Sequence, residues 1–527
     1  MRKSIFVLCA LLAISSSAFA AKSVIVLVPD GCSQSILTAA RWYKSFAMDS
    51  NEPLALDEIG ATGLVKTYMA NSIITDSASA ASAFASGYKN TDGMLGVGAA
   101  DSLKPNLTGF SSPIAPYAPM ETILEAAKVA GKSTGLVATS RISHATPAAY
   151  ACHQWTRNNY GAVQEDMVYN GLTVSFGGAE RYLKGNRTDG EDLEQVLLDR
   201  GYSYIKTRDE LLALPSDTAK AWGSFAWSDM QPDLDRGMNA PTEPSLSEMT
   251  AKAIEILSQN ENGFFIMIEG SQVDWAGHAN DPIYMITDFL AFDEAVRVAL
   301  NYAKTNEDTL VMVYPDHNTG ALSIGHEQGG SLPGYTSTEI ATLIDPIKDA
   351  SVTVQTLITK YPANPTPADV RAAFVQYWGD FWNVMTDDQA QNILDMGGDS
   401  YGVSSYISAE FTAFGWTSHG HTGEDVPMWC YAGANCELPI GTVDNTDLAF
   451  IAADAMGITL NGTDPWVEYD ESVLDTTDLN ANPVATIDGV QYPVSKNIKI
   501  LADSTVEEMN YITVYAPKSG KVYIPVQ

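Results

Sequence analysis

Ser77 stands where a serine hydroxyl could be activated as a nucleophile. The chain reads Ile-Thr-Asp-Ser-Ala at residues 74–78 and continues into the alanine- and serine-rich stretch SASAASAFASGYK. This composition predicts a helix with Ser77 in its first turn, where unpaired backbone N–H groups and the positive end of the helix dipole favour an alkoxide or a phosphate. Because Thr-Asp-Ser before a helix is also an ordinary capping sequence, the hypothesis needs support from other parts of the chain.

That support comes from carboxylates and histidines with the spacing of metal ligands. The chain has only seven histidines, and His278 follows Asp274 by four positions. Both side chains therefore lie on one face of a helix, an arrangement that suits zinc. The other candidate ligands are Asp30, Glu269, Asp316, His317 and His421. Such a set could fill two zinc sites with nitrogen and oxygen ligands and one all-oxygen magnesium site.

Continuous apolar runs predict the buried strands that position these residues. Runs rich in Val and Ile begin at Ser23, Ala61, Ser133, Phe264, Thr309 and Val426. Runs without alternation are typical of a sheet covered on both faces, and several end in Asp, Glu or Ser, where open α/β sheets place their sites. The clearest helix pattern covers residues 244–259, with Ser245 as N-cap and Glu248 three residues later. We expect an α/β fold with a large central, mostly parallel sheet and helices on both faces.

The remaining segments divide the chain around this sheet. Residues 1–20 have a basic start, an apolar run and an Ala-Phe-Ala end, as secretory signal peptides do. We expect a catalytic domain over residues 21–463, interrupted by an insertion at about 329–413 that is rich in Thr, Pro, Asp and aromatic residues. Residues 464–527 predict a β-rich C-terminal extension that ends in a hairpin.

The strongly acidic composition restricts the partners of the protein. Without the first twenty residues, 28 Lys and Arg face 64 Asp and Glu, a net charge of −36. Such a surface repels nucleic acid and anionic membranes. No later run approaches the ~18 apolar residues that a membrane span requires. We expect an exported protein, periplasmic or extracellular, that neither binds nucleic acid nor inserts into a membrane.

Four cysteines remain after removal of the signal peptide. Cys430 and Cys436 bracket five residues and could close a small disulfide loop in an oxidising compartment. Cys32 and Cys152 could pair or stay free. No C-x-x-C spacing occurs, so zinc bound by thiolates is not expected.

The order of the motifs resembles that of the alkaline phosphatases, the two-zinc, one-magnesium enzymes of bacteria and animals. The resemblance covers about residues 23–325 and 417–457 and implies broad hydrolysis of small phosphate monoesters, through a phosphoserine, to phosphate and an alcohol. The matching stretches are VPDG (Asp30), TDSASAASAFASG (Ser77), SHATPAA (His144, Thr146), HQWTRNNY (Arg157), EGSQVDWAGHAND (Glu269, Asp274, His278), YPDHNTGAL (Asp316, His317) and HGHTGEDVP (His421).

The resemblance also implies a role for each matching residue. Asp274, His278 and His421 would bind the first zinc, and Asp30, Asp316 and His317 the second. Magnesium would be bound by Asp30, Thr146 and Glu269. Ser77 would be the nucleophile, and Arg157 would hold two phosphate oxygens through its planar fork. Many bacterial members have Asp and Lys at the positions of His144 and Trp275, which lie near the site. Because Trp275 replaces the lysine, a cation would be missing near the phosphate.

Three other functions are alternatives to the hydrolysis of phosphate monoesters. A sulfatase of the same superfamily requires a C-x-P-x-R-like motif, which is absent around Ser77, and diesterases generally use Thr and lack the magnesium-site residues. A non-catalytic exported protein that binds metal or serves in adhesion would be expected to have lost Ser77, Arg157 or a zinc ligand, and none is lost.

The sequence leaves the oligomeric state open between a homodimer and a monomer. Alkaline phosphatases, which the sequence resembles, are commonly homodimers. In the inserted segment, helical patterns begin near Pro367 and Thr386. The aromatic residues Trp378, Phe381 and Trp382 have helical spacing and predict a contribution to a homodimer interface or to access to the cleft. A monomer with a surface insertion is the alternative.

Overall fold

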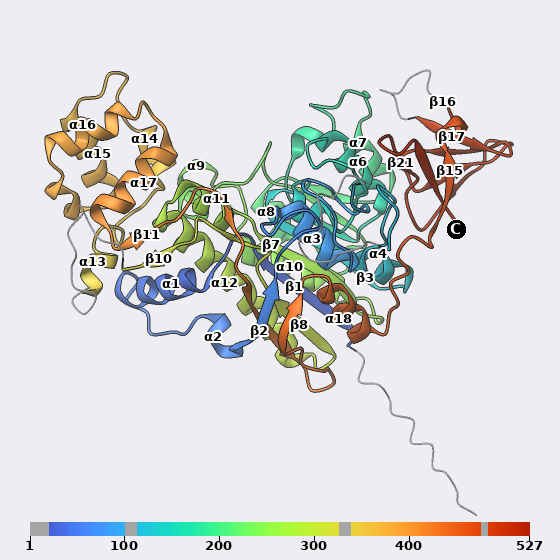
Figure 1. The fold of residues 1–527 in the computed structure, drawn as a ribbon, viewed down its shortest axis with the longest axis horizontal. Coiled ribbons are helices and arrows are strands. Elements are labelled where there is room, and N and C mark those ends of the chain that lie inside the picture. Colours follow the sequence, from blue (N-terminus) through green and yellow to red (C-terminus); the bar gives the residue numbers. More distant parts are fainter. Residues whose placement is uncertain (1–20, 101–112, 326–338, 476–482, 527) are drawn as a thin grey trace, which may run out of the picture.

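A ten-stranded sheet forms the centre of the molecule (Figure 1). The computed structural model describes residues 21–100, 113–325, 339–475 and 483–526, so the expected signal peptide lies outside the described residues. The strand order is β14-β2-β13-β8-β1-β7-β3-β4-β6-β5. Only β13 (Val426–Ala432) runs antiparallel to its neighbours, β2 (Ala61–Lys66) and β8 (Thr309–Val313). The expected large, mostly parallel sheet is confirmed.

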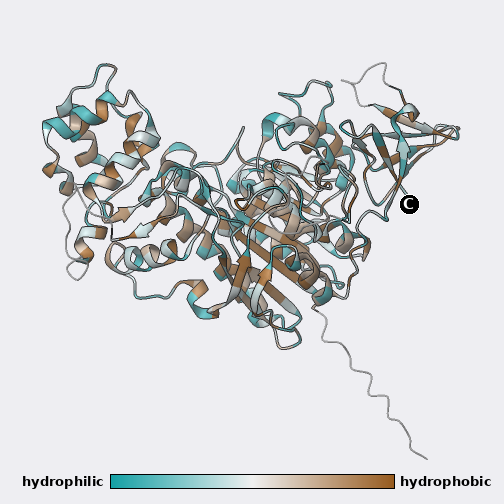
Figure 2. Ribbon diagram, in the orientation of Figure 1, coloured by the Kyte–Doolittle hydropathy of each residue, from teal (hydrophilic) through white to brown (hydrophobic). Residues whose placement is uncertain are grey.

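The side chains of β1 (Ser23–Pro29) alternate between two cores, one on each face of the sheet. Ile25 and Leu27 pack on one face with α1 (Gln34–Phe46), α10 (Leu246–Leu257) and α12 (Pro282–Thr305). Val24, Val26 and Val28 pack on the other face with α3 (Ser77–Ser86), α4 (Ile123–Val129) and α18 (Asp447–Met456). Figure 2 shows the central strands as the most apolar part of the ribbon, which explains why these strands lack alternation.

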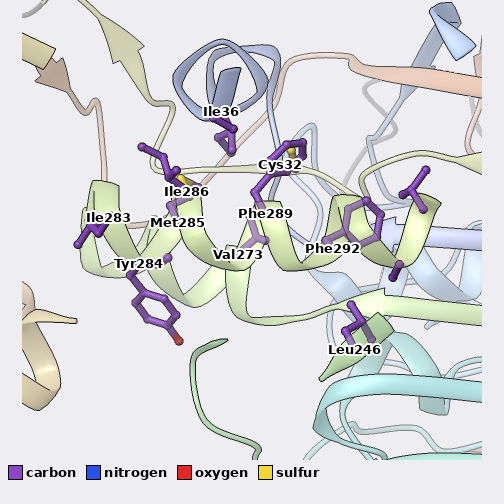
Figure 3. Close-up of a cluster of buried hydrophobic side chains, with 14 of the residues drawn as sticks. Cys32, Ile36, Leu246, Val273, Ile283, Tyr284, Met285, Ile286, Phe289 and Phe292 are labelled. Carbon is purple, nitrogen blue, oxygen red and sulfur yellow. The ribbon is translucent and has the colours of Figure 1, made fainter. Parts of the chain in front are cut away.

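Aromatic side chains of α12 fill much of the first of these cores. Phe289 and Phe292 are fully buried and lie near Ile36 of α1 and Val273 of α11 (Gln272–Ala279), as Figure 3 shows. Helix α10 begins at the predicted N-cap Ser245, whose hydroxyl and Glu248 form a complete capping box. Helix α12 also packs on α11, which carries Asp274 and His278.

The insertion is a bundle of short helices whose buried side chains continue the core around α12. It contains α13 (Ile340–Ile344), α14 (Val354–Ile358), α15 (Pro367–Trp378), α16 (Asp387–Asp395) and α17 (Ser400–Phe411). Trp378 and Trp382 are 0% exposed, and their rings lie 5.5 Å apart beside Phe374. The expectation that both tryptophans serve an interface or the cleft is therefore wrong, because each fills the interior of the insertion.

The C-terminal segment contains two small sheets, on the opposite side of the body from the insertion (Figure 1). One has β15 (Trp466–Asp470), β21 (Val514–Ala516) and β22 (Lys521–Pro525), the last two forming the predicted hairpin. The other has five short strands, β16 (Leu474–Asp475), β17 (Val484–Ile487), β18 (Val490–Pro493), β19 (Ile498–Ile500) and β20 (Val506–Glu508). Within the described residues, no helix is long and apolar enough to cross a membrane.

The expected disulfide between Cys430 and Cys436 is not formed. In the described part of the chain, Cys32, Cys152, Cys430 and Cys436 are all free. Cys430 is buried in β13 opposite Met312, whereas the Cys436 thiol lies 3.8 Å from the carbonyl oxygen of Glu307. The β-strand geometry of the first cysteine, which short sequence spacing does not reveal, directs its side chain into the core.

We expect Trp382→Ala to destabilise the insertion by about 3 kcal/mol or more, because a fully buried tryptophan leaves a large cavity. Denaturant unfolding followed by circular dichroism measures the loss. Val384→Ala, at a position that is 60% exposed in the same segment, is the control. Equal effects of the two substitutions would contradict the assignment of Trp382 to a core.

Candidate active site and metal centre

Ser77 is the first residue of helix α3, as predicted, and its hydroxyl is not used for capping. The N-cap is Asp76, whose side chain accepts a hydrogen bond of 2.9 Å from the backbone N–H of Ser79. Ser77 is 2% exposed, and its Oγ lies 3.3 Å from Nε2 of His317. Because Asp76 caps the helix, the Ser77 hydroxyl remains available for chemistry at the positive end of the helix dipole.

The first group of candidate ligands joins helix α11 to a short strand. Asp274 and His278 lie on α11, and His421 lies on β12 (His421–Thr422). The Asp274 carboxylate is 3.3 Å from His278 Nε2 and 3.6 Å from His421 Nε2. The Nδ1 atoms of both rings are bonded to backbone oxygens, those of His419 and Thr75. These bonds point both Nε2 atoms towards the shared carboxylate, as in many metal sites.

The second group lies beside the first. His317 Nε2 is 3.5 Å from Asp30 Oδ1 and 3.1 Å from Asp316 Oδ2, and all three residues are buried. The rings of His317 and His421 stack with centroids 3.6 Å apart, which brings the two groups together. Ligand atoms of Asp274, Asp30 and His317 also lie within 4.8 Å of one another.

A third group gathers around Glu269 at the end of β7 (Phe264–Gly270). Because Val28 of β1 pairs with Glu269, the next strand positions bring Asp30 close to this carboxylate. Ligand atoms of Asp30, His144 and Glu269 lie within 4.8 Å of one another. Thr146, the expected ligand, is fully buried, and its hydroxyl has no hydrogen-bond partner among the described residues.

Several hydroxyl groups that donate hydrogen bonds to the candidate ligands were not predicted from the sequence. Ser271 donates a hydrogen bond of 2.6 Å to Glu269, and Ser140 donates one of 3.3 Å to the same oxygen. Thr319 donates to Asp274 at 2.5 Å. Ser271 and Thr319 follow predicted ligands by two or three positions, but single hydroxyl residues in strand-end loops carry little signal of their own.

The buried carboxylates fit divalent cations. Atoms without a hydrogen-bond partner in the described part of the chain include both oxygens of Asp30, Oε1 of Glu269 and Oδ2 of Asp316. Burial, and next the charge of Asp316, raise the pKa of Asp30 well above its ordinary value, and burial raises the pKa of Glu269 to about 7. A positive charge in their midst would satisfy these oxygens, and oxygen and imidazole ligands suit magnesium and zinc.

Arg157 comes from another part of the chain and lies next to Asp76, the N-cap of helix α3, beside this centre. Its Nη1 donates to Asp76 at 3.0 Å, and its Nη2 lies 3.0 Å from His144 Nε2. Burial, and then the charge of Arg157, lower the pKa of His144 well below its ordinary value. Trp275 meets the His144 ring edge-on with centroids 5.7 Å apart. Arg157, His144 and Trp275 therefore lie together, as the sequence suggested.

The family model for alkaline phosphatase matches residues 21–458 of the sequence. The chain belongs to the alkaline phosphatase family. It is 33% identical to alkaline phosphatase 3 of Bacillus subtilis, with 81% of this chain and 87% of that protein covered. Membership makes it an enzyme of a metal-dependent family that hydrolyses phosphate monoesters.

Solved structures agree with this assignment of family and fold. Alkaline phosphatase of Thermus thermophilus superposes with a TM-score of 0.73 at 26% identity, covering 84% of this chain and 93% of that one. Cold-active alkaline phosphatase from a psychrophilic Shewanella species gives a TM-score of 0.68 at 29% identity, covering 82% and 99% of the two chains.

A further acidic group lies outside the candidate centre and already holds a cation. Ligand atoms of Glu165, Asp189 and Glu191 lie within 4.8 Å of one another. Arg187 donates to Glu165 at 2.9 Å, is also hydrogen-bonded to Asp189 and approaches Glu191 to 4.0 Å. The charge of these carboxylates is thus already balanced in part by the Arg187 guanidinium, so this group provides a comparison for the candidate centre.

We expect Glu269→Gln to lower the divalent metal bound per chain, because the substitution removes a buried negative charge next to Asp30. Elemental analysis after dialysis against metal-free buffer measures the loss. Glu165→Gln is the matched control, since its carboxylate pairs with Arg187. Unchanged metal content in Glu269→Gln, or equal loss in both variants, would contradict the assignment of Glu269 as a ligand.

Proposed function

We propose that the protein hydrolyses small phosphate monoesters through a phosphoserine formed on Ser77, at a site for two zinc ions and one magnesium ion. The observation that carries the proposal is the position of the Ser77 hydroxyl. It lies at the start of α3, 3.3 Å from His317 in the second ligand group, with Arg157 bonded to the neighbouring Asp76. A nucleophile, a set of ligands and a phosphate-binding cation thus converge.

The ligand groups suggest which residues would hold each ion. Asp274, His278 and His421 would hold the first zinc, and Asp30, Asp316 and His317 the second. Asp30, Glu269 and Thr146 would hold magnesium, with His144 close enough to take part. When bound, these ions would supply electrostatic stabilisation to the entering and leaving oxygens of an in-line displacement and to the ionised serine hydroxyl.

The side chains of the protein would form the bond to phosphorus and hold the phosphate. Ser77 Oγ would lose its proton to solvent and form a bond to phosphorus as the bond from phosphorus to the alcohol oxygen breaks, and the alcohol oxygen would take up a proton from solvent. Water would attack the phosphoserine in turn, releasing phosphate and restoring the serine. Arg157 would hold two phosphate oxygens through its planar fork, which Asp76 and His144 orient in advance.

We further propose that the protein is exported to the periplasm or beyond, that residues 21–463 form the catalytic domain with an insertion at about 329–413, and that residues 464–527 are an extension. The signal-like composition of residues 1–20 supports export. We propose a homodimer only because members of the alkaline phosphatase family are commonly homodimers.

Ser77→Ala should abolish nearly all turnover while leaving the fold and the metal content unchanged, because the hydroxyl is the proposed point of attachment of the phosphoryl group. Acid quenching with radiolabelled phosphate, followed by peptide mapping, should place the label on Ser77 of the unmodified protein. Label on a different residue, or substantial turnover by the variant, would contradict the mechanism.

Arg157→Ala should weaken inhibition by inorganic phosphate by ten-fold or more, on the order of the loss of a charged hydrogen bond. The fall in kcat should be smaller than in Ser77→Ala, since the ions would still organise the displacement. Steady-state kinetics with phosphate as inhibitor tests this. An unchanged inhibition constant would show that Arg157 does not touch the phosphate.

A further inference from the structure

The last helix of the insertion stands against the helix that carries two candidate ligands. Helix α17 packs on α11, and the hydroxyl of Ser404 donates to Asp281, which caps the helix after α11, at 3.4 Å. The insertion therefore reaches the rim of the candidate centre, although in its described part it contributes no member to the ligand groups.

Two exposed rings lie on this rim. Tyr401, in the first turn of α17, is 44% exposed, and its ring is nearly parallel to that of His419, with centroids 6.4 Å apart and planes inclined by 9°. His419 is exposed as well. Exposed aromatic rings of fixed orientation are surfaces on which another ring can stack.

His419 is fixed directly to a ligand of the first group. Its Nδ1 lies 2.7 Å from the backbone oxygen of His278, and the Nδ1 of His278 is bonded in return to the backbone oxygen of His419. Its Nε2 lies 3.3 Å from the hydroxyl of Ser405 on α17. The pair of rings is thus held at a defined position beside His278.

The direction of the proposed reaction brings the leaving group to this position. Ser77 lies beside His317, in the second ligand group. In an in-line displacement the leaving oxygen departs on the side of phosphorus opposite the nucleophile, and the proposed function assigns that side to Asp274, His278 and His421. The organic part of the substrate then extends past His278.

Tyr401 borders this side of the centre through His419, whose ring it faces and which is bonded to the backbone oxygen of His278. The other aromatic residue near the centre, Trp275, contacts His144 beside Arg157, on the side of the phosphate. The two aromatic groups therefore border different parts of a bound substrate.

We propose that Tyr401 and His419 form a subsite for the leaving group, which favours phosphate esters of aromatic alcohols over those of small aliphatic alcohols. The inference rests on the proposed hydrolysis of phosphate monoesters. It makes Tyr401, which belongs to the insertion, a residue that determines specificity, while the phosphoryl group itself is held by Arg157 and the ligand groups.

The test compares phenyl phosphate with ethyl phosphate in the complete, metal-loaded protein. Tyr401→Ala should lower the ratio of kcat/KM for phenyl phosphate to that for ethyl phosphate by about five-fold, the size of one ring-stacking contact. Tyr401→Phe should keep the ratio, because it keeps the ring. The inhibition constant of inorganic phosphate should stay the same in both variants, since phosphate has no leaving group.

Tyr406→Ala controls for general damage to α17. Tyr406 lies on the same helix, but its hydroxyl accepts a hydrogen bond from Asn392 of α16, inside the insertion, at 3.3 Å. This variant should keep the ratio of the two substrates. An equal change in the ratio for Tyr401→Ala and Tyr406→Ala would overturn the assignment of Tyr401 as a specificity residue.

The outcomes separate the subsite from the proposed function. If the unmodified protein hydrolyses neither ester, the proposed function fails. If it hydrolyses both and Tyr401→Ala leaves the ratio unchanged, or alters the two substrates equally, only the subsite is overturned. A changed inhibition constant for phosphate would overturn it too, because the substitution would then act through the centre.

Discussion

The crowding of buried carboxylates at the ends of the central strands is the constraint on which the rest of the site depends. Asp30, Glu269 and Asp316 are each at most 1% exposed, and each has at least one oxygen without a hydrogen-bond partner among the described residues. Ionised carboxylates in such surroundings are strongly unfavourable unless a cation compensates them. Parallel pairing brings the three together, because β1 lies between β7 and β8 and their carboxyl ends share one edge.

The residues around this edge are held in place by contacts from other parts of the chain. Backbone oxygens of Thr75 and His419 hold the rings of His421 and His278, so that the free ring nitrogens meet at Asp274. The loop with Arg157 is supported from the C-terminal segment, where Trp466 packs on His153 with centroids 5.1 Å apart and Lys518 lies 4.3 Å above the ring of Trp155. Catalytic geometry of this kind depends on such supporting contacts.

Local patterns in the sequence predicted the strands, the helix of Ser77 and the pairing of Asp274 with His278, because each depends on neighbours within a few residues. The closeness of His144 to Glu269 and the bond from Thr319 to Asp274 arise from strand order, which periodicity does not encode. The two tryptophans of the insertion show a related limit. Helical spacing predicted one shared face, but α15 ends at Trp378 and Trp382 lies in a separate 3-10 helix, Asp380–Val384. Only tertiary packing shows that both rings are internal.

The way in which the insertion joins the body explains how it can border the site without disturbing the ligands. The chain leaves the body at β10 (Ser323–Ile324) and returns at β11 (Phe414–Gly415), and these two strands pair with each other. Its entry and exit are therefore side by side, and the helices between them pack around Trp382 in a cluster that is continuous with the core around α12. Residues on the surface of α17 can change without loss of that core or of the carboxylate edge. A fold built in this way separates the chemistry at phosphorus, which the strand ends determine, from the recognition of the leaving alcohol, which an added bundle can adjust.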